Sequence, residues 1–263
     1  MSTKKFAVLG SPIAHSKSPL LHNAAYDYLG IGGIYSQAEV SAGKLSSFLS
    51  TRIADFDGFS ITMPLKEEAY ECADVHDEIS ARIQVANTLI LRDHSWYASN
   101  TDVLGFQEIF KRMDSSAFDT PLILGSGSTA KSAVLAMNLL GVSKIHMMAR
   151  NELAVRTIQH LFPDLEISFQ SWGGEVENAS LVVIAVPIIQ GVTFTTNITQ
   201  FVDVNYTDSN PDIFELIQAD TYSYINGLHL LVYQAAFQVI QMRTIDDDRF
   251  EDIVRVMFAA LEI

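Results

Sequence analysis

Short apolar runs alternate with helical patterns along almost the whole chain, and this alternation limits the available folds more than any other feature. Residues 6–10 predict a strand, and residues 18–30 predict a helix with Ser18 as its N-cap and Gly30 at its end. Such alternation is typical of an α/β fold, in which helices cover the faces of a sheet. The same patterns predict strands over 57–64, 144–150, 167–172, 180–187 and 200–206, a hairpin of 86–91 with 96–100, a strand and helix over 121–141, and helices over 102–113, 228–242 and 249–263.

Composition and charge exclude several classes of function. Acidic residues outnumber basic ones by 31 to 17, which gives a formal net charge of −14 at pH 7. Phosphate backbones repel such a chain, so we expect no nucleic-acid partner. We find no membrane-helix run and no signal-peptide core, and the single cysteine, Cys72, can form no internal disulfide. We therefore expect a cytoplasmic protein without a membrane partner that binds a small-molecule substrate, as a monomer or homodimer.

A glycine-rich turn lies between a predicted strand and a predicted helix, and consists of Gly125, Ser126, Gly127, Ser128, Thr129 and Ala130. Gly125 allows a tight turn, Gly127 allows the backbone to approach a pyrophosphate, and Ala130 allows close helix packing. The free N–H groups at the start of the helix would bind the phosphates. These features predict a dinucleotide-binding turn, and a tight turn that binds no ligand is the alternative.

The residues after the next strand indicate which dinucleotide binds. A site for NAD usually carries an acidic residue here, which binds the ribose 2′-hydroxyl, whereas this chain has Ala149, Arg150 and Asn151. A guanidinium can instead bind a 2′-phosphate through two hydrogen bonds. Arg150 therefore favours NADP as the cofactor, while an ordinary exposed arginine at a strand end is the alternative interpretation.

We expect an α/β protein of two domains. Residues 105–227 predict a Rossmann-type domain that binds NADP, because the glycine turn lies in its first strand–turn–helix unit. Residues 1–104 predict an α/β substrate domain with a mixed sheet, because the hairpin within it is antiparallel. The helices of 228–263 are expected to pack back on the first domain, since the second already has a full set of elements.

Polar side chains gather at the predicted strand and hairpin ends of the first domain. They are Ser16 and Ser18, Thr62 and Lys66, Asn87 and Thr88, and Asn100, Thr101 and Asp102. Residues at strand ends converge on the crevice of an open α/β sheet, where small ligands bind. Each of them also has a structural explanation, since such residues commonly cap helices, form turns or lie on solvated helix faces.

The segments HSKSP, SITMPLK, ANTL and SNTDVLGF resemble the ordered motifs of the shikimate dehydrogenase family. The glycine turn and the segment NGLHLLVYQ follow in the order of that family, so the resemblance covers essentially the whole chain. It implies an NADP-dependent oxidoreductase that reduces 3-dehydroshikimate reversibly to shikimate, within aromatic amino-acid biosynthesis.

The resemblance also implies roles for individual residues. The hydroxyls of Ser16 and Ser18 would bind the substrate carboxylate without burying a second full charge. Thr62, Asn87 and Gln234 would hold ring hydroxyls or the reacting oxygen, Tyr206 would lie near the substrate, and Gly227 would join the glycine turn and Arg150 in binding the cofactor.

Lys66 and Asp102 are the expected catalytic residues. Hydride transfer to a carbonyl requires a proton for the developing alkoxide, and a lysine beside that oxygen can supply it. A neighbouring carboxylate would orient the lysine and compensate its charge. Either residue could pass the proton, directly or through water. No metal is expected, because the seven histidines show no ligand spacing.

Several positions depart from the usual pattern of the family. Residues 186–191, VPIIQG, replace its Asn-x-Thr loop, so cofactor contacts in that loop are not expected to carry over. Ser60 stands where an asparagine is usual, and Leu230 where a methionine is usual. Arg150 keeps the arginine of an Asn-Arg-Thr motif but not its neighbours. None of these changes removes a proposed catalytic group.

Other functions remain open at this point. A quinate or dual quinate/shikimate dehydrogenase would share the same motifs, and it often prefers NAD, against which Arg150 argues. A non-catalytic sensor of a shikimate-like metabolite would have no need for the glycine turn or for Lys66 and Asp102. A related dehydrogenase fold acting on folate or another substrate lacks support in the order of the motifs.

Overall fold

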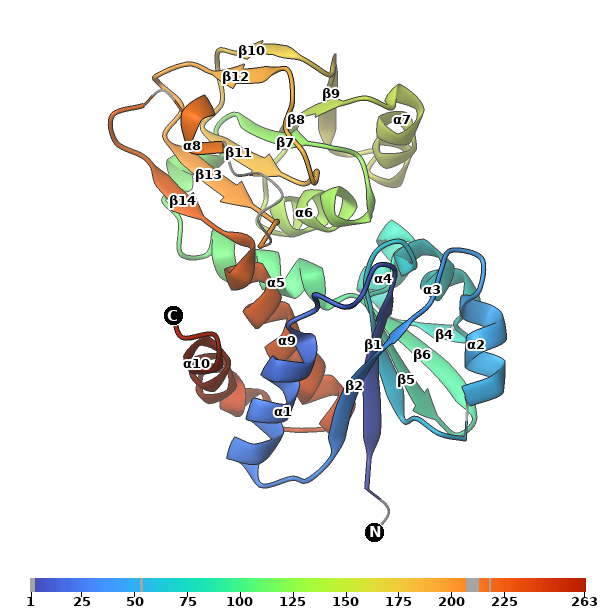
Figure 1. Cartoon of the computed structure of the whole chain (residues 1–263). Coiled ribbons are helices and arrows are strands. Elements are labelled where there is room, and N and C mark those ends of the chain that lie inside the picture. The colour runs from blue at the N-terminus through green and yellow to red at the C-terminus, as the bar shows by residue number, and fades with distance from the viewer. Residues whose placement is uncertain (1–2, 53, 207–212, 218) are drawn as a thin grey trace. The chain divides into compact units, whose positions relative to one another are not determined.

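The chain divides into two units, as a computed structural model that describes residues 3–52, 54–206, 213–217 and 219–263 shows. The first unit is formed by Met1–Gly105 and Leu231–Ile263, and the second by Phe106–Leu230. Both boundaries fall inside helices, α5 (Thr101–Phe110) and α9 (Gly227–Arg243), which are labelled in Figure 1. No helix in the described part of the chain is both long enough and apolar enough to cross a membrane.

The first unit contains a mixed sheet. Its order within the described residues is β2-β1-β3-β5-β6-β4. The strands are β1 (Lys5–Gly10), β2 (Ile34–Glu39), β3 (Gly58–Ile61), β4 (Val75–His76), β5 (Thr88–Arg92) and β6 (Ser95–Ser99). β1 is parallel to β2 and β3, while β5 is antiparallel to β3 and β6. The expected mixed sheet and hairpin are confirmed, and the hairpin turns at Asp93 and His94 with φ of 50° and 65°, values typical of a two-residue hairpin turn.

Helices flank this sheet, and the last two return to it from the far end of the chain. They are α1 (Ser18–Leu29), α2 (Leu45–Arg52), α3 (Lys66–Cys72), α4 (Glu78–Ile83), α9 and α10 (Phe250–Ala260), with a 3-10 turn at Asp247–Arg249. The ring of Tyr233 on α9 lies 5.9 Å from that of Phe258 on α10, and α10 lies beside α1 (Figure 1). The expectation that the last helices pack on the first domain is confirmed.

Two helix ends differ from the sequence prediction. Ser18 was expected to cap α1, but the N-cap is Lys17, which is already in the right-handed helical conformation. Ser18 is instead the first residue of the helix, and its N–H donates to Ser16 Oγ at 3.3 Å. Gly30 ends α1 as predicted, with φ of 64°. α5 ends at Phe110 rather than at residue 113, because the N–H groups of Arg112 and Met113 bond only three residues back, which tightens the last turn.

The second unit contains a parallel sheet with the order β14-β13-β11-β7-β8-β9 in its described residues. Counted along the chain, this is the 3-2-1-4-5-6 order of a dinucleotide-binding fold, which confirms the Rossmann-type expectation. The strands are β7 (Pro121–Leu124), β8 (Lys144–Ala149), β9 (Glu166–Ser171), β11 (Leu181–Ile184), β13 (Gln200–Asp203) and β14 (Ser223–Ile225). The short strands β10 (Gly174–Val176) and β12 (Val192–Phe194) form a separate parallel pair.

The helices of the second unit are α6 (Ser128–Leu139), α7 (Glu152–Leu161) and α8 (Ile213–Leu216), with a 3-10 turn at Ser115–Phe118. The strands β7 and β11 are buried at every position, as expected for central parallel strands that are covered on both faces. The order of the sheet reverses between these two strands, and in open α/β sheets ligands bind at that point. The sequence places the glycine turn directly after β7, at this reversal.

Candidate active site

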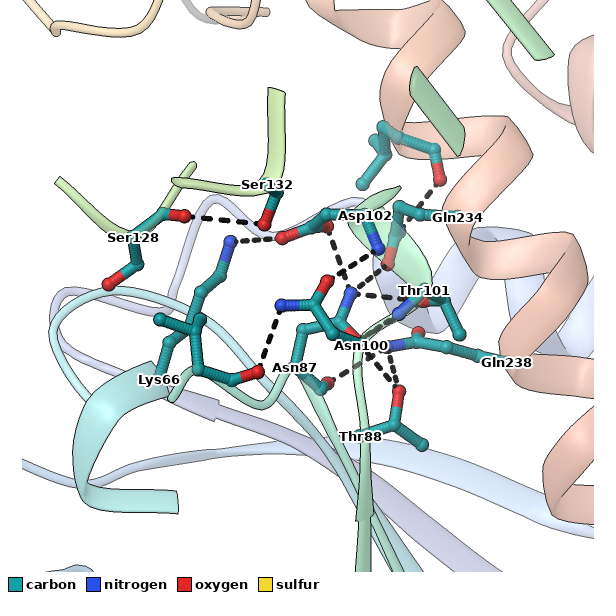
Figure 2. Close-up of polar contacts among 12 residues, drawn as sticks. Lys66, Asn87, Thr88, Asn100, Thr101, Asp102, Ser128, Ser132, Gln234 and Gln238 are labelled. Carbon is teal, nitrogen blue, oxygen red and sulfur yellow. Dashed lines mark hydrogen bonds and ion pairs between the residues drawn. The ribbon is translucent and has the colours of Figure 1, made fainter. Parts of the chain in front are cut away.

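Lys66 and Asp102 form a buried ion pair in the first unit. Lys66 Nζ lies 2.6 Å from Asp102 Oδ2, and only 13% and 7% of the two side chains are exposed (Figure 2). Lys66 is the first residue of α3 and Asp102 is the second residue of α5. Charges with so little solvent contact must be compensated by a partner, and here each compensates the other.

The backbone around residues 85–87 holds the two halves of this pair together. Ala86 N–H donates to the Lys66 carbonyl at 2.9 Å, which fixes the start of α3. On the other side, Asn100 donates from Nδ2 to the Val85 carbonyl and accepts from Asp102 N–H, both at 3.0 Å. Asn100 therefore fixes the start of α5. The buried residues 85–87, directly before β5, thus connect the helix starts that carry Lys66 and Asp102.

Asn87 lies at the centre of the site, and its side chain is bonded at both ends. Asn87 Nδ2 donates to Asp102 Oδ1 at 2.9 Å, to Thr101 Oγ1 at 2.9 Å and to Gln234 Oε1 at 3.3 Å. Asn87 Oδ1 accepts from the backbone N–H of Thr101 at 2.8 Å. Four residues predicted from separate motifs, Lys66, Asn87, Asp102 and Gln234, thus meet in one hydrogen-bonded cluster (Figure 2).

Ser16 and Thr62 lie on two loops that run side by side at the carboxyl ends of β1 and β3, and Ser18 begins α1 directly after the first of these loops. Thr62 N–H donates to the Leu9 carbonyl at 2.9 Å, and Ser11 N–H donates to the Met63 carbonyl at 3.0 Å. Ser18 is buried, whereas Ser16 and Thr62 are half-buried. These hydroxyls have the placement that the strand-end argument predicts, and Ser16 Oγ already accepts a hydrogen bond from Ser18 N–H.

Sequence reasoning missed Gln238, a glutamine of α9 whose side chain is 1% exposed. Its Nε2 donates to the Asn87 carbonyl and to Thr88 Oγ1, both at 3.0 Å. Its Oε1 accepts from Ser60 Oγ at 2.7 Å. A glutamine one helical turn after Gln234, on a helix with many apolar residues, is a signal that could have marked it as a candidate, because buried amides need partners.

His22 and Tyr35 are buried next to Gln238 and to its partner Ser60, respectively. Their rings are stacked, with centroids 3.9 Å apart, and Tyr35 OH donates to Ser60 Oγ at 2.6 Å. Burial lowers the pKa of His22 to about 3, although its hydrogen bond with Gln238 acts in the opposite direction. Burial also raises the pKa of Tyr35 well above its usual range, against the effect of the bond to Ser60. Both side chains are therefore neutral at pH 7.

In the second unit, the glycine turn has the backbone that the motif predicts. Gly125 has φ of +113°, and a Cβ there would lie 2.8 Å from the Ala185 carbonyl oxygen, so only glycine fits. Gly127 is the N-cap of α6 and a Cβ there would meet nothing within 4 Å. Ser126, Ser128 and Thr129 are half-buried and Ala130 is buried. Among the described residues, nothing would crowd a Cβ at Gly127, and the first turn of a helix is a place where backbone N–H groups can bind an anion.

Arg150 follows β8 and is exposed, with its guanidinium over an aromatic ring. Its Cζ lies 4.3 Å from the centre of the Trp172 ring, which is within cation–π range. Trp172 Nε1 in turn donates to the Gln190 carbonyl at 2.8 Å. Asn151 Oδ1 accepts from Ala154 N–H at 3.1 Å and caps α7, so this departure from the family pattern has a structural role.

Gly227 and Tyr206 lie near the carboxyl end of β13. A Cβ at Gly227 would collide with the Val204 carbonyl, and Gly227 N–H donates to the Asn205 carbonyl at 3.1 Å. Packing alone therefore requires glycine at 227. Tyr206 is half-buried, which raises the pKa of its hydroxyl. Asn205 Nδ2 donates to the Val186 carbonyl at 2.8 Å and so holds the start of the altered 186–191 loop.

The strand order, the glycine turn at its reversal and the separate α/β unit with a buried lysine–carboxylate pair define a class: two-unit α/β proteins with a dinucleotide-binding fold. The family model for the shikimate dehydrogenase substrate binding domain matches residues 8–89. The shikimate dehydrogenase (NADP(+)) of Caldicellulosiruptor saccharolyticus is 31% identical over 249 residues, which are 88% of this chain and 89% of that protein. The chain therefore belongs to the shikimate dehydrogenase family.

Two further comparisons agree with this assignment. The crystal structure of Mycobacterium tuberculosis shikimate dehydrogenase is 28% identical with a TM-score of 0.80, and the match covers 98% of this chain and 99% of that one. The pentafunctional AROM polypeptide of Candida tropicalis is 29% identical over 95% of this chain. The chain spans 16% of the length of that polypeptide.

Proposed function

We propose that the chain is an NADP-dependent shikimate dehydrogenase that interconverts 3-dehydroshikimate and shikimate. The buried ion pair of Lys66 and Asp102, bonded to Asn87, is the observation that carries this proposal. It provides a proton donor and a fixed carboxylate beside polar side chains in the unit that the family model matches. The relatives named shikimate dehydrogenase (NADP(+)) support both the substrate and the cofactor.

The residues of the second unit fit a dinucleotide phosphate. Gly127 leaves the start of α6 uncovered, and the helix offers N–H groups and the positive end of its dipole to a pyrophosphate. The Arg150 guanidinium lies over the Trp172 ring, with Cζ 4.3 Å from the ring centre, and its N–H groups would bind a 2′-phosphate. When bound, the nicotinamide would supply the hydride. Gly125, Ser126, Ser128, Thr129, Ala130 and Gly227 complete the proposed cofactor site.

In the first unit, Lys66 would donate a proton to the oxygen of the carbonyl as negative charge develops there. Asp102 would hold the ammonium group of Lys66 in place through the 2.6 Å ion pair. Asn87 would fix Asp102 from the other side and, with Thr62 and Gln234, hold ring hydroxyls or the reacting oxygen. Tyr206 would lie near the substrate. Ser16 and Ser18 would bind the substrate carboxylate. Each of these polar groups would reject an analogue that lacks its partner.

Residues 1–104 and 228–263 would then bind the substrate, and residues 105–227 would bind the cofactor. We place this reaction in the cytoplasm, because the single cysteine, Cys72, is a free thiol that needs no oxidising compartment.

Initial rates of the purified protein with shikimate or quinate, each with NADP or NAD, test the proposal. Turnover is expected only with shikimate and NADP, followed as reduced nicotinamide. A preference for quinate would mean that the protein is a quinate dehydrogenase. A preference for NAD would remove the proposed role of Arg150 in binding the 2′-phosphate. Binding of both ligands without turnover would instead indicate a metabolite sensor.

Replacement of Arg150 by alanine tests the cofactor preference. The Kd for NADP, measured by calorimetry, is expected to rise about 10- to 100-fold, because a charge-assisted pair to the 2′-phosphate would be lost, while the Kd for NAD changes little. Arg156→Ala is a matched control, since Arg156 lies exposed on α7 and pairs with Glu152. An equal loss for NADP and NAD would mean that Arg150 has only a structural role.

A further inference from the structure

We propose that Gln238 is a positioning residue of the active site, which acts through a chain of hydrogen bonds that all point toward Asp102. The chain runs from Tyr35 through Ser60, Gln238, Thr88 and Asn87 to the carboxylate. Every member is at most 5% exposed. The significance for catalysis rests on the function proposed above, whereas the direction of the chain follows from the contacts alone.

The orientation of Gln238 is fixed by a group that can only accept. One of its amide atoms lies 3.0 Å from the backbone carbonyl of Asn87, so this atom must be the donor, Nε2. The opposite atom is therefore the acceptor Oε1, and it faces Ser60 Oγ at 2.7 Å. Gln238 thus accepts from one side of the buried region and donates to the other.

The orientation of Asn87 is fixed by a group that can only donate. The backbone N–H of Thr101 lies 2.8 Å from one atom of the Asn87 amide, which must therefore be Oδ1. Thr88 Oγ1 receives a hydrogen from Gln238 Nε2 and so donates its own hydrogen to Asn87 Oδ1, at 2.9 Å. Asn87 Nδ2 is left to donate to Asp102 Oδ1 at 2.9 Å (Figure 2).

The direction of the first hydrogen bonds, from Tyr35 to Gln238, is fixed in the same way by which groups donate and which accept. Ser60 donates to Gln238 Oε1, so its oxygen is available to accept from Tyr35 OH at 2.6 Å. His22 Nε2 lies 3.3 Å from the same Oε1 and must carry the hydrogen there. His22 Nδ1 is then the unprotonated nitrogen, and within the described residues it has no hydrogen-bond partner.

This one-way order assigns a separate partner to each oxygen of Asp102. Asn87 donates to Oδ1, and Lys66 pairs with Oδ2. Hydrogen bonds in series polarise one another, so the donor at the end of the chain binds the carboxylate more firmly than an isolated amide would. Gln238 therefore sets the position of Asp102, and through it that of Lys66, without touching either residue. Ser60, a departure from the family pattern, is its direct partner.

Hydrogen exchange of the Asn87 side-chain amide, measured in the ligand-free protein, tests the proposed chain of hydrogen bonds. In Gln238→Leu the exchange rate, measured by NMR on asparagine-labelled protein, is expected to rise about tenfold because the buried amide opens more often. Gln241→Leu is the matched control, since Gln241 lies one turn nearer the end of α9. It accepts a hydrogen bond from Ser99, which is not a member of the proposed chain of hydrogen bonds. Unchanged exchange in Gln238→Leu, or an equal rise in Gln241→Leu, would overturn the proposal.

Ser60→Ala is a second variant, which decides the matter if Gln238→Leu does not fold. It removes one link but leaves both donations from Gln238 Nε2 in place. Exchange of the Asn87 amide is expected to rise about two- to threefold. If Ser60→Ala exchanges like the wild type, the one-way chain is refuted.

Kinetics separate positioning from a structural role. In Gln238→Leu, kcat is expected to fall about tenfold while KM for substrate changes less than about threefold, since misplaced reacting groups slow the chemical step. Combination with Ser60→Ala should add little, whereas combination with Gln241→Leu should be additive. If the wild type fails to turn over shikimate, the proposed function fails, while the exchange experiment still decides the role of Gln238.

Discussion

Replacement of Lys66 by alanine is expected to lower kcat roughly 100-fold or more, in line with typical losses of a general acid. The reason is its position: Nζ lies 2.6 Å from the buried Asp102 carboxylate, which holds the ammonium group in place. The affinity for the cofactor should remain nearly intact, because the proposed cofactor residues belong to the other unit. Steady-state rates with shikimate and NADP, together with NADP binding by calorimetry, measure both effects.

Two further variants make this result specific to the chemistry of Lys66. Lys111→Ala removes a lysine that is 57% exposed and pairs with Glu108, and its kcat should equal that of the wild type. Lys66→Arg keeps the charge beside Asp102 but holds its proton too firmly to give it up at neutral pH, so kcat should stay low. Wild-type turnover in a folded Lys66→Ala protein would remove Lys66 from the mechanism.

Acid is expected to unfold the protein partly through His22. The pKa of this ring is about 3 in the folded chain against 6.5 for its ordinary value, because burial disfavours the charged form. Between these values the unfolded chain binds a proton that the folded chain does not, so stability falls as the pH decreases from 6.5 to 3. The difference of about 3.5 pH units corresponds to about 5 kcal/mol in total, and to about 2 kcal/mol at pH 5.

Urea unfolding of the wild type and of His22→Phe at pH 7.5 and pH 5 measures this contribution. Phenylalanine keeps a ring against Tyr35 but cannot titrate, so the variant should lose about 2 kcal/mol less than the wild type over this interval. His15→Phe is the control, because His15 is exposed. Equal losses in the wild type and in His22→Phe would show that His22 is not held neutral by the fold.

The sequence predicts features that depend on residues near one another in the chain. The glycine turn at 125–130 needs only a strand before it and a helix after it, and the hairpin around Asp93 needs only two adjacent apolar runs. Short or polar elements were missed: β2 reads IYSQAE, in which apolar and polar residues do not alternate strictly, so the sequence shows no clear strand pattern. The cap of α1 was misassigned because Ser16, Lys17 and Ser18 are all placed to begin a helix, and only the backbone decides among them.

The candidate site likewise contains residues that local motifs predict and one residue whose partners only the structure shows. Motifs placed Lys66, Asn87 and Asp102 at strand and helix ends, where such ends converge, and the structure brings these three together. Gln238 bonds Ser60, which is 178 positions away, and nothing local to α9 indicates that partner. The spacing from Gln234 can mark Gln238 as a candidate, but identifying Ser60 as its partner required the three-dimensional contact, because a buried amide has many possible partners.

Because the first unit is built from two stretches of chain, its site is finished late in synthesis. The ribosome makes Asn87, Thr88 and Asp102 first, then the whole of Phe106–Leu230, and only afterwards the part of α9 that carries Gln234 and Gln238. Domains generally fold in the order in which they emerge, so the second unit can fold while the first still lacks two helices. Until α9 arrives, the Asn87 carbonyl and the Thr88 hydroxyl lack the amide that they bond in the folded protein. A nascent chain halted before that helix would therefore hold a nearly complete second unit and an unfinished first unit.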